Sequence, residues 1–415
     1  MFRIWLYLDF FIFLKGLFSK KKKEFINLIY KKISKQSEKK YVLITSQCRV
    51  GFLFILKFLK IKTKKSEIIF CAYNLPEMIN VATKLNYKIK FCDLNYKTGS
   101  MNVREVKKKI SKNTSAIVLT NMFNDYKNSR EIKNLAKKYQ IPLIEDNAIY
   151  FDNHTKKNNK IYYSGSFGDF SIYSFNIMKN VSSFYGGAIS TNNKEFKDFY
   201  EKEYNKFINF PKILLIKQLL IYLVLKTMSI NIFFKLFFIH IIRLSHHYNL
   251  SFILKLIYPS IKSLKKNLPK YYFTKMSHLS IIVTYLQLKN EKKRRKLFRL
   301  RQIKHAYYLK KIRIIKNNLL TLNINDRSYQ NFLDFPLLVK NKKSLNMFLL
   351  NHGIEVRYKH YYNCEKLLKK NISCMNAERY ENELICLPLH TKINHVYINY
   401  TINKIKQFYL KSKVE

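Results

Sequence analysis

The chain contains little of several residue types. Its 415 residues include only 8 glycines, 7 prolines and 1 tryptophan, and 78 lysines and arginines outnumber 26 acidic residues, for a formal charge of +52. Such a charge would suit a nucleic-acid or anionic-membrane partner. The basic residues are scattered rather than gathered in one patch, and the richness in Lys, Asn, Ile, Tyr and Phe is what an AT-rich genome supplies. We therefore favour compositional drift and expect no specific nucleic-acid partner, while membrane association stays open.

Cysteine pairs and metal-binding motifs are also lacking. The six cysteines form no C-x-x-C pair, and the ten histidines include no H-E-x-x-H motif. Cys71 and Cys92 lie in apolar, strand-like runs and are expected to be buried small hydrophobes. His390 is expected to be structural. The sequence thus predicts no metal site and a reduced, cytoplasmic compartment.

No uncharged apolar run reaches the length of about 18 residues that a membrane-spanning helix needs. The opening segment, Met1 to Phe18, carries Arg3, Asp9 and Lys15 and makes a poor signal peptide. Residues Pro211 to Leu268 are dense in Ile, Leu and Phe but are interrupted by lysines, and they predict two or three hydrophobic helices. These helices either pack at a subunit interface, as a buried hairpin in an oligomer, or lie on a membrane surface; we favour the buried hairpin.

Apolar runs and amphipathic stretches alternate from about Tyr41 to Asn193, which predicts an α/β domain with a large, mostly parallel sheet. A long basic helix over Leu286 to Ile312 should lead into a smaller C-terminal α/β domain with a strand at Phe332 to Val339 and a final helix at Val396 to Leu410. The predicted division is an N-terminal helical segment (1–40), a large domain (41–205), a hydrophobic helical insert (206–274) and a small domain (275–415).

Glycine is concentrated around one lysine. Four of the eight glycines (Gly165, Gly168, Gly186 and Gly187) flank the short segment that contains Lys179. Asp146 ends an apolar run and precedes Lys179 by 33 residues (179 − 146). A lysine amine can condense with the aldehyde of pyridoxal 5'-phosphate (PLP), and a carboxylate can keep the pyridine nitrogen protonated. Asp146 could otherwise simply cap the next helix. Ser174 could donate to the cofactor phosphate, and the helix after Thr45 offers backbone N–H groups as a phosphate seat.

These phrases resemble the DegT/DnrJ/EryC1/StrS family of PLP-dependent sugar aminotransferases. The sequence motifs that are similar to those of the family are Gly165 to Asp169, Tyr173 to Phe175, Lys179-Asn180, Gly186 to Ala188 and Glu145 to Ala148. The resemblance implies a fold-type-I aminotransferase architecture, PLP bound by Lys179 and Asp146, and a phosphate facing the backbone of Arg49 and Val50. It also implies glutamate as amino donor, a nucleotide-linked keto-sugar as acceptor, a role in cell-surface polysaccharide or glycolipid biosynthesis, and a homodimer. Relatives that dehydrate such sugars have histidine in place of the lysine, so Lys179 favours transamination.

The chain also departs from the family's pattern. Ile149 stands where a glutamine is usual, Leu75 where an aromatic ring usually stacks on the cofactor, and Phe273 and Lys275 where an asparagine and an arginine reach a neighbouring subunit's phosphate. His360 falls where the family places substrate-facing residues, although it could equally be a packed loop histidine. Two alternatives remain. These departures motivate a degenerate homologue with a structural or regulatory role. The charge of +52 and the hydrophobic insert motivate a membrane-surface protein, peripheral at the inner face of the membrane, or a nucleic-acid-binding protein.

Overall fold

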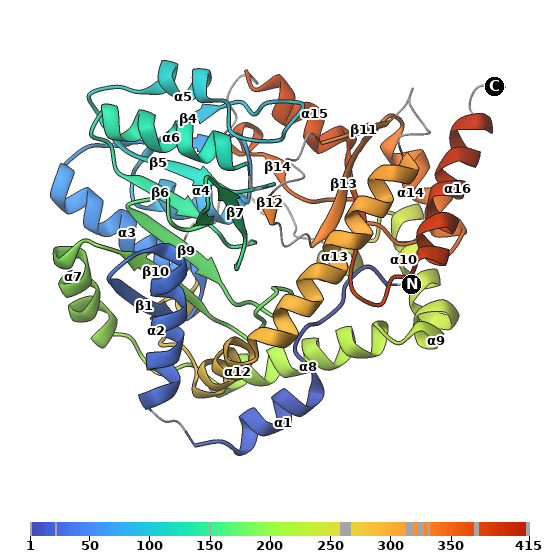
Figure 1. Cartoon of the computed structure of the whole chain (residues 1–415), viewed down its shortest axis with the longest axis horizontal. Coiled ribbons are helices and arrows are strands. Elements are labelled where there is room, and N and C mark those ends of the chain that lie inside the picture. Colours follow the sequence, from blue (N-terminus) through green and yellow to red (C-terminus); the bar gives the residue numbers. More distant parts are fainter. Residues whose placement is uncertain are drawn as a thin grey trace.

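A seven-stranded sheet forms the centre of the larger part of the molecule (Figure 1). The computed structural model describes residues 2–20, 23–123, 125–149, 151–257, 267–312, 319–322, 328–329, 333–368 and 373–411. The sheet order is β1-β10-β9-β6-β5-β2-β4, and only β10 runs antiparallel to its neighbours. The strands are β1 (Tyr41–Thr45), β2 (Glu67–Cys71), β4 (Lys88–Cys92), β5 (Thr114–Thr120), β6 (Leu143–Asp146), β9 (Phe170–Ser174) and β10 (Gly187–Thr191). The predicted α/β fold with a mostly parallel sheet is confirmed.

Helices cover both faces of this sheet because successive strand residues point to opposite sides. Leu43 and Ile189 share one apolar core with α3 (Cys48–Thr63), whereas Ile44 and Ala188 share another with α2 (Lys23–Ser37) and α12 (His278–Lys289). The strands are buried on both faces, as parallel sheets require. The remaining helices of this part are α4 (Pro76–Lys84), α5 (Val103–Lys109), α6 (Tyr126–Lys138) and α7 (Lys194–Asn205).

The C-terminal part is a second, smaller α/β unit with its own core. Its antiparallel sheet has the order β11-β13-β15, formed by β11 (Leu319–Thr321), β13 (Asp334–Val339) and β15 (Leu384–Pro388). Its helices are α13 (Glu291–Ile312), α14 (Lys342–Asn351), α15 (Met375–Glu383) and α16 (His395–Lys411). The predicted strand at Phe332 to Val339 begins two residues later, at Asp334, and Phe332 itself lies outside the described residues.

One predicted helix proves to be two. The expected single helix over Leu286 to Ile312 is divided at Asn290, where α12 ends and α13 begins. Asn290 accepts at its side-chain oxygen from the N–H of Lys293 at 3.2 Å, a local bond that competes with a continuous helix. The prediction of one helix was therefore wrong, because the apolar and basic pattern runs through the break.

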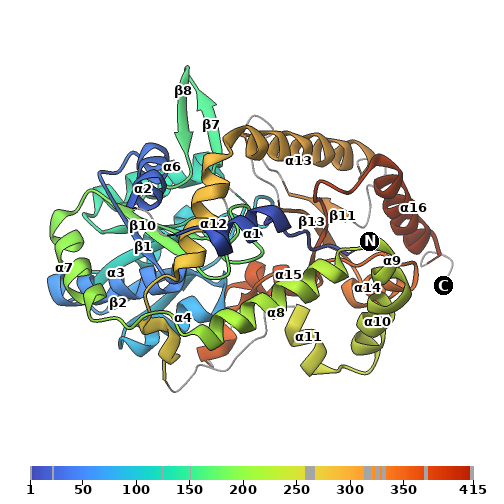
Figure 2. The ribbon, with the colours of Figure 1, turned by 90° about the horizontal axis from the view of Figure 1, so that it is seen from below.

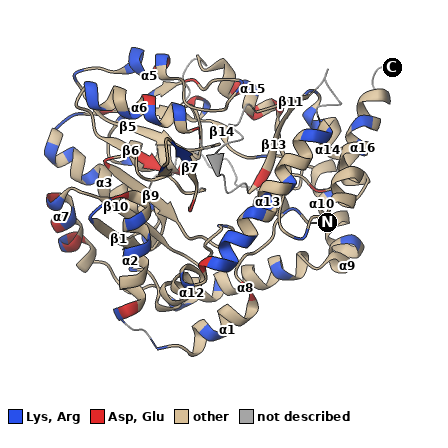
Figure 3. Cartoon of the chain, viewed as in Figure 1, with Lys and Arg blue, Asp and Glu red and all other residues tan. Residues whose placement is uncertain are grey.

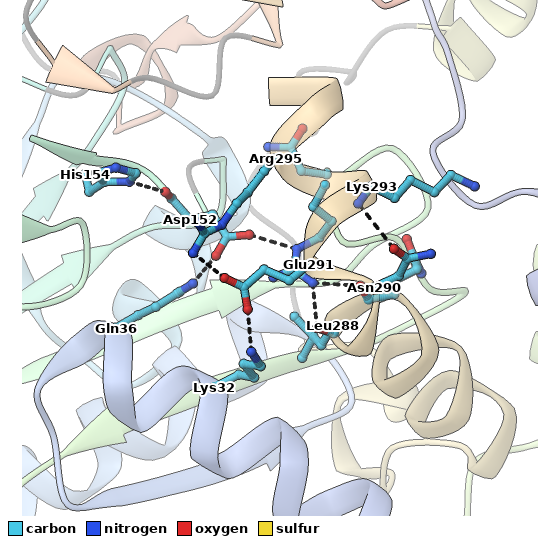
Figure 4. A network of polar contacts seen from close by, with 12 residues as sticks. Lys32, Gln36, Asp152, His154, Leu288, Asn290, Glu291, Lys293 and Arg295 are labelled. Carbon is cyan, nitrogen blue, oxygen red and sulfur yellow. Dashed lines mark hydrogen bonds and ion pairs between the residues drawn. The ribbon is translucent and has the colours of Figure 1, made fainter. Parts of the chain in front are cut away.

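Ion pairs fasten the start of α13 to the large domain (Figure 4). Glu291 accepts from Lys32 of α2 at 2.6 Å, and hydrogen bonds with this lysine and with Arg295 lower the pKa of Glu291 to about 2. Arg294 donates through Nε to Asp152 at 2.9 Å and through Nη1 to the carbonyls that end α12. Gln36 also donates to Asp152. The network fixes the angle at which α13 crosses toward the small domain.

The insert forms a series of helices beneath the two parts (Figure 2). It contains α8 (Lys212–Met228), α9 (Asn231–Phe233), the π-helical turn η1 (Phe234–Phe238), α10 (Ile239–His247) and α11 (Ser251–Ile257). Within the described residues no single helix is long and apolar enough to cross a membrane, although the pair Lys212–Met228 and Asn231–His247, bent by 81°, passes the same test together. Many apolar side chains of these helices are exposed in the single chain, so a hairpin buried in an oligomer stays a prediction.

The N-terminal segment is part of the fold. Phe2, Ile4, Leu6 and Leu8 are buried against the insert helices, and Arg3 forms an almost completely buried ion pair with Glu355 at 2.7 Å. The helix α1 (Phe10–Phe18) and then α2 follow this extended stretch. The first residues therefore tie the large domain, the insert and the small domain together.

Candidate active site at the carboxyl edge of the sheet

Strand pairing brings the predicted site residues to one edge of the sheet. Gly187 is paired with Thr45 on one side and with Ser174 on the other, and Asp146 is paired with Ile172 of β9. The carboxyl ends of β1, β6 and β9 therefore meet, which is where open α/β sheets bind ligands. Lys179 follows directly from the end of β9.

The start of α3 is built to receive an anion. In the described structure the N–H groups of Cys48 and Arg49, at the first two positions of α3, have no backbone acceptor, while Val50 donates to the Gln47 carbonyl at 3.1 Å. The buried Ser46 Oγ and Gln47 Nε2 also have no partner there. Together with the positive end of the helix dipole, these donors suit a phosphate. The predicted seat at Arg49 and Val50 thus moves one residue back, to Cys48 and Arg49, because the first helical turn uses the Val50 amide.

The side chain of Arg49 points away from this seat. Its Nη1 lies 3.7 Å from Glu77 Oε1, and its guanidinium lies 5.9 Å from the ring centroid of Tyr272. Only the backbone of Arg49 is therefore offered to a phosphate. Gly187 explains why the turn is so close to the sheet: a Cβ there would lie 2.5 Å from the Cys48 nitrogen.

Backbone hydrogen bonds shape the loop that carries Lys179. Phe175 donates to Gly186 at 2.9 Å, Ser183 donates to Phe175 at 2.7 Å, and Lys179 donates to Asn176 at 2.9 Å. Two helices of the second half hold the loop from outside, since Gln287 of α12 accepts from the Ser182 N–H at 3.0 Å and Arg301 of α13 donates to Asn180 Oδ1 at 2.6 Å. Hydrogen bonds therefore stabilise the loop that carries Lys179 from both within and outside. Ser174, half-buried, accepts a long bond of 3.5 Å from the Asn176 N–H.

The charges around Lys179 favour its neutral, nucleophilic form. Burial, together with the guanidinium of Arg357, lowers the pKa of Lys179 to about 8, and the carboxylate of Asp146 acts in the opposite direction. Burial also raises the pKa of Asp146, although Lys179 and a 2.9 Å bond from the Ala148 N–H partly compensate. Lys179 and Asp146 therefore act on each other electrostatically, and their roles toward a cofactor stay a prediction. Cys48 lies within reach of the same two charges.

Glu145, next to Asp146, has a supporting position that sequence reasoning did not assign. It is fully buried, points to the opposite face of β6, and accepts from the N–H groups of Gly165, Phe167 and Gly168 at 2.8, 2.9 and 3.0 Å. Asn121 adds a fourth donor at 2.8 Å. A buried carboxylate with four N–H donors fixes the glycine-containing turn from which β9 begins. Its adjacency to Asp146 and the glycine-rich phrase were the available signals.

The small domain reaches the site through a two-residue strand. β14 (Tyr362–Asn363) pairs with β3 (Tyr73–Asn74) of the large domain, which places His360 and Tyr361 beside Tyr73. The His360 ring stacks on Tyr73 and Phe123, with centroids 6.4 and 5.9 Å apart. Burial, Arg357 and Lys179 lower the pKa of His360, and its buried Nδ1 has no partner in the described structure. His360 is thus both packed in an aromatic cluster and close to the lysine.

Arg357 is a further charged residue that the sequence did not single out. One of its terminal nitrogens lies 2.8 Å from Asp334 Oδ2, while its buried Nε has no partner among the described residues. It is held in place by two backbone bonds with Cys386 of β15, of 2.9 and 3.1 Å. No local sequence signal could show that the charge of this arginine acts on Lys179, because the two positions are 178 residues apart (357 − 179).

The residues that depart from the family's pattern occupy three places. Ile149 is buried, and its carbonyl accepts from Asn180 at 3.4 Å; Leu75 is the N-cap residue of α4. Phe273 is 37% exposed and packs on Phe207 of the same chain, and the Lys275 N–H donates to the Ile208 carbonyl. Their effect on a cofactor stays a prediction. His390 is buried and bonded to the Phe2 carbonyl at 3.0 Å, in agreement with its predicted structural role.

The observed groups fit PLP in three respects. Unpaired buried donors at the start of α3 suit its phosphate, and a lysine with a pKa of about 8 suits its aldehyde. The third respect concerns Asp146. Burial raises the pKa of this carboxyl, so its negative charge is not fully stabilised by the protein, and a protonated ring nitrogen would stabilise that charge.

Comparison with known proteins agrees with this geometry. Residues 20–205 match the DegT/DnrJ/EryC1/StrS aminotransferase family. A UDP-4-amino-4,6-dideoxy-N-acetyl-beta-L-altrosamine transaminase of Campylobacter jejuni is 32% identical over 148 residues, which are 32% of this chain and 38% of the relative. The chain thus matches well under half the length of this curated relative.

Solved structures agree over nearly the whole chain. The Helicobacter pylori aminotransferase PseC, involved in the biosynthesis of pseudoaminic acid, has a TM-score of 0.69 at 16% identity, with coverage of 96% of this chain and 95% of that one. The Escherichia coli GDP-4-keto-6-deoxy-D-mannose-3-dehydratase with bound hydrated PLP has a TM-score of 0.70 at 19% identity, covering 96% and 97%. The fold is therefore that of fold-type-I aminotransferases. Residues 20–205, which match the DegT/DnrJ/EryC1/StrS aminotransferase family, contain every strand of the large sheet.

Proposed function

We propose that the protein is a PLP-dependent aminotransferase that moves an amino group from glutamate to a nucleotide-linked keto-sugar, in polysaccharide or glycolipid biosynthesis. The observation that carries the proposal is Lys179, a lysine of lowered pKa that is an electrostatic neighbour of Asp146 beyond the carboxyl ends of β6 and β9. The relatives' printed activities, transamination and dehydration of nucleotide sugars, support the substrate class.

Each residue has a distinct task in this proposal. Lys179 would hold the cofactor covalently, and its released, neutral amine would serve as the base that accepts the proton of the donor Cα and as the acid that gives a proton back. Asp146 keeps a proton on the ring nitrogen. Ser174, Ser46, Gln47 and the amides of Cys48 and Arg49 hold the phosphate. When bound, PLP supplies the electron sink for the pair left on the donor carbon.

Arg357 and His360 are proposed to face the substrates. Arg357 has a free buried Nε and lies within electrostatic reach of Lys179, so it can bind the carboxylate of an amino-acid donor. His360 offers an unpartnered Nδ1 beside it. Neutral histidine has one donor and one acceptor, which suits a sugar hydroxyl.

A half-reaction experiment tests the function. Glutamate added to the PLP-loaded protein should shift the absorbance of the lysine-bound cofactor to that of the pyridoxamine form, and one member of a panel of nucleotide-linked keto-sugars should reverse the shift. A spectrum that responds neither to glutamate nor to other amino acids would contradict aminotransfer. Purified protein that binds no PLP would favour the degenerate homologue, motivated by Ile149, Leu75 and Phe273.

We further propose a cytoplasmic homodimer. The six cysteines are all buried and free, which suits a reducing compartment. Phe273 and Lys275 lie at the position from which the family reaches a neighbouring site, and a dimer would give the exposed Phe273 a partner surface. Light scattering of the purified protein tests the dimer. Attachment to a membrane is a separate proposal that rests on the surface of the insert.

A further inference from the structure

The insert exposes a continuous apolar surface. On α8 the exposed large side chains are Ile213, Ile216, Leu220, Leu223 and Val224, a spacing that places them on one side of the helix. The series continues through Ile230, Ile232, Phe233, Leu236, Phe237, Ile241 and Leu244 of the following turns. We call these residues the insert face. Isolated exposed apolar residues are ordinary, but a run of this length along successive helices marks an interaction surface.

The other side of α8 is fixed to the body of the protein. Tyr222 is fully buried, its hydroxyl donates to the Leu8 carbonyl at 3.3 Å, and Gln218 donates to the Tyr185 hydroxyl at 2.9 Å. The helix therefore lies flat along the molecule, with one side packed and the other presented outward. This is the arrangement of a helix that binds in the plane of an interface.

The N-terminal helix α1 packs against α8 and carries exposed aromatic side chains of its own. Phe13 of α1 packs on Tyr222 of α8 with ring centroids 5.6 Å apart, and Figure 1 shows both helices along the lower edge of the molecule. Phe11 and Phe18 of α1 are 83% and 85% exposed. Four consecutive lysines, Lys20 to Lys23, follow α1 in the sequence. Aromatic side chains followed by a basic run are typical of segments that meet an anionic bilayer.

The charge of the insert has a single sign. From Tyr204 to Asn290 the sequence contains no Asp or Glu at all, although it includes Lys212, Lys217, Lys226, Lys235 and Arg243. Figure 3 shows the contrast with α7, where acidic and basic residues alternate. Compositional drift toward lysine explains many basic residues, but it does not explain the complete loss of acids beside an exposed apolar face. A surface that is apolar and purely cationic complements anionic lipid headgroups.

A cavity of about 560 Å³ lies where the insert meets the small domain. Lys235, His240 and Arg243 line it together with residues of α14 and α16, and no described lining residue is acidic. It is bordered by η1 and α10, the same elements that carry the second half of the insert face. The cavity therefore offers an anionic headgroup a cationic recess next to the apolar surface.

A second copy of the chain fits this face less well. In a two-fold dimer the same surface meets itself, so the lysines of the insert would face lysines with no acid in the segment to compensate them. A bilayer removes this conflict, because lysine stems can extend to the headgroups while the apolar side chains enter the boundary. The 81° bend between the two longest parts of the insert also keeps them from forming one straight span.

We infer that the insert face, together with α1, docks in the plane of an anionic lipid bilayer. Apolar contacts of the insert face provide the affinity, and the acid-free segment selects anionic over zwitterionic lipid. The inference does not depend on the proposed reaction, since it uses none of the residues at the sheet edge.

Vesicle flotation with the full-length, PLP-loaded protein tests the inference. The wild-type protein should float with vesicles of phosphatidylcholine mixed with phosphatidylglycerol, much less with phosphatidylcholine alone, and binding should persist at moderate salt. The double variant Ile216→Asp/Leu220→Asp should reduce the bound fraction at least about tenfold. The triple variant Lys217→Gln/Lys235→Gln/Arg243→Gln should remove the preference for anionic vesicles.

Matched controls separate the insert face from general properties of the surface. Ile61→Asp changes an isoleucine of similar exposure (65%) on α3 and should float as the wild type does. Lys108→Gln/Lys127→Gln removes two exposed lysines elsewhere and should leave the lipid preference intact. Equal melting temperatures would show that the variants fold.

Three results would overturn the inference. The wild-type protein could stay unbound with both vesicle types, or the double aspartate variant could float as well as the wild type. The third is a pair of results: the wild-type protein is a dimer that binds no vesicle, and the variant Ile216→Asp/Leu220→Asp is a monomer. That pair would assign the face to a second copy. Glutamate response of the cofactor spectrum is followed in parallel, so that a failure of docking is not confused with a failure of the proposed reaction.

Discussion

The carboxyl edge of the large sheet and the insert belong to one chain with the same compositional bias, yet different physical constraints act on their residues. At the sheet edge, backbone atoms lie close to backbone atoms: a Cβ on Gly187 would lie 2.5 Å from the Cys48 nitrogen and 2.7 Å from the Gln47 carbonyl carbon. On the outer side of α8, by contrast, side chains such as Ile213 are 71% exposed in the single chain. At the sheet edge, each position accepts only one kind of residue. On the outer side of α8, a position requires only that its side chain be apolar or basic. This difference can be tested by paired substitutions.

The largest expected effect is at Lys179. Lys179→Ala should abolish covalent cofactor attachment and reduce turnover by about 10²- to 10⁴-fold, because it removes the proton-transferring amine. The measurement is borohydride reduction followed by mass spectrometry, together with the rate of the glutamate half-reaction. Lys217→Ala, in the insert, is the matched control and should behave as the wild type. Covalent cofactor retained in Lys179→Ala would reject the assignment.

Glu145 should show the next largest effect, on stability. Glu145→Ala leaves the N–H groups of Gly165, Phe167 and Gly168 without their acceptor and should lower the free energy of unfolding by about 3–5 kcal/mol. Urea denaturation measures it. Glu195→Ala removes a carboxylate that is 66% exposed and paired with Lys62, and should cost no more than about 1 kcal/mol. Equal losses in the two variants would show that burial and the N–H donors do not set the contribution of Glu145.

Gly187 links stability to cofactor binding. Gly187→Ala places a Cβ against the Cys48 nitrogen, and we expect a loss of about 1–3 kcal/mol in stability and a weaker PLP affinity, since the amide must move. Gly353→Ala is the control: its φ of +74° makes alanine strained, but nothing lies within 4 Å of the new Cβ. It should lower the melting temperature without changing the PLP titration. A PLP titration unchanged by Gly187→Ala would contradict the phosphate seat at Cys48.

A pH profile tests the electrostatics of the lysine. Only the neutral amine attacks the cofactor aldehyde, so the rate at which cofactor-free protein captures PLP should rise with pH through a midpoint near 8 rather than near 10.5. Between these values the unfolded state binds more protons than the folded one at this lysine, so its contribution to stability also rises with pH. Arg357→Gln removes a like charge and should move the midpoint up, and Asp146→Asn should move it down.

The control for the pH profile is Arg104→Gln, at an exposed arginine of α5, which should leave the midpoint unchanged. A midpoint that does not respond to Arg357→Gln would show that Arg357 does not act on Lys179 in solution.

The sequence predicted the part of the site that is encoded locally. Lys179, Asp146 and the turn after Thr45 could be proposed as site residues because glycines and short motifs lie next to them in the chain, and their roles stay predictions. The role of Val50 was misjudged by one residue, since the amide used by the first helical turn depends on where α3 begins. Arg357 and His360 could be related to Lys179 only through the pairing of β14 with β3, a contact between distant segments. The break at Asn290 was hidden because hydrophobic and basic residues continue across it.

The smallest expected effect is on the outer side of α8. Ile216→Ser and Leu220→Ser should each change the free energy of unfolding by less than about 0.5 kcal/mol, since in the single chain both side chains are already in contact with solvent. Leu225→Ala, on the same helix but 5% exposed, should cost about 2–5 kcal/mol because it leaves a cavity in the core shared with Tyr222. Thermal unfolding of all three variants in the absence of lipid gives the comparison. A large loss from Ile216→Ser would mean that another protein surface covers the insert face in solution, and the two sides of α8 would then no longer differ.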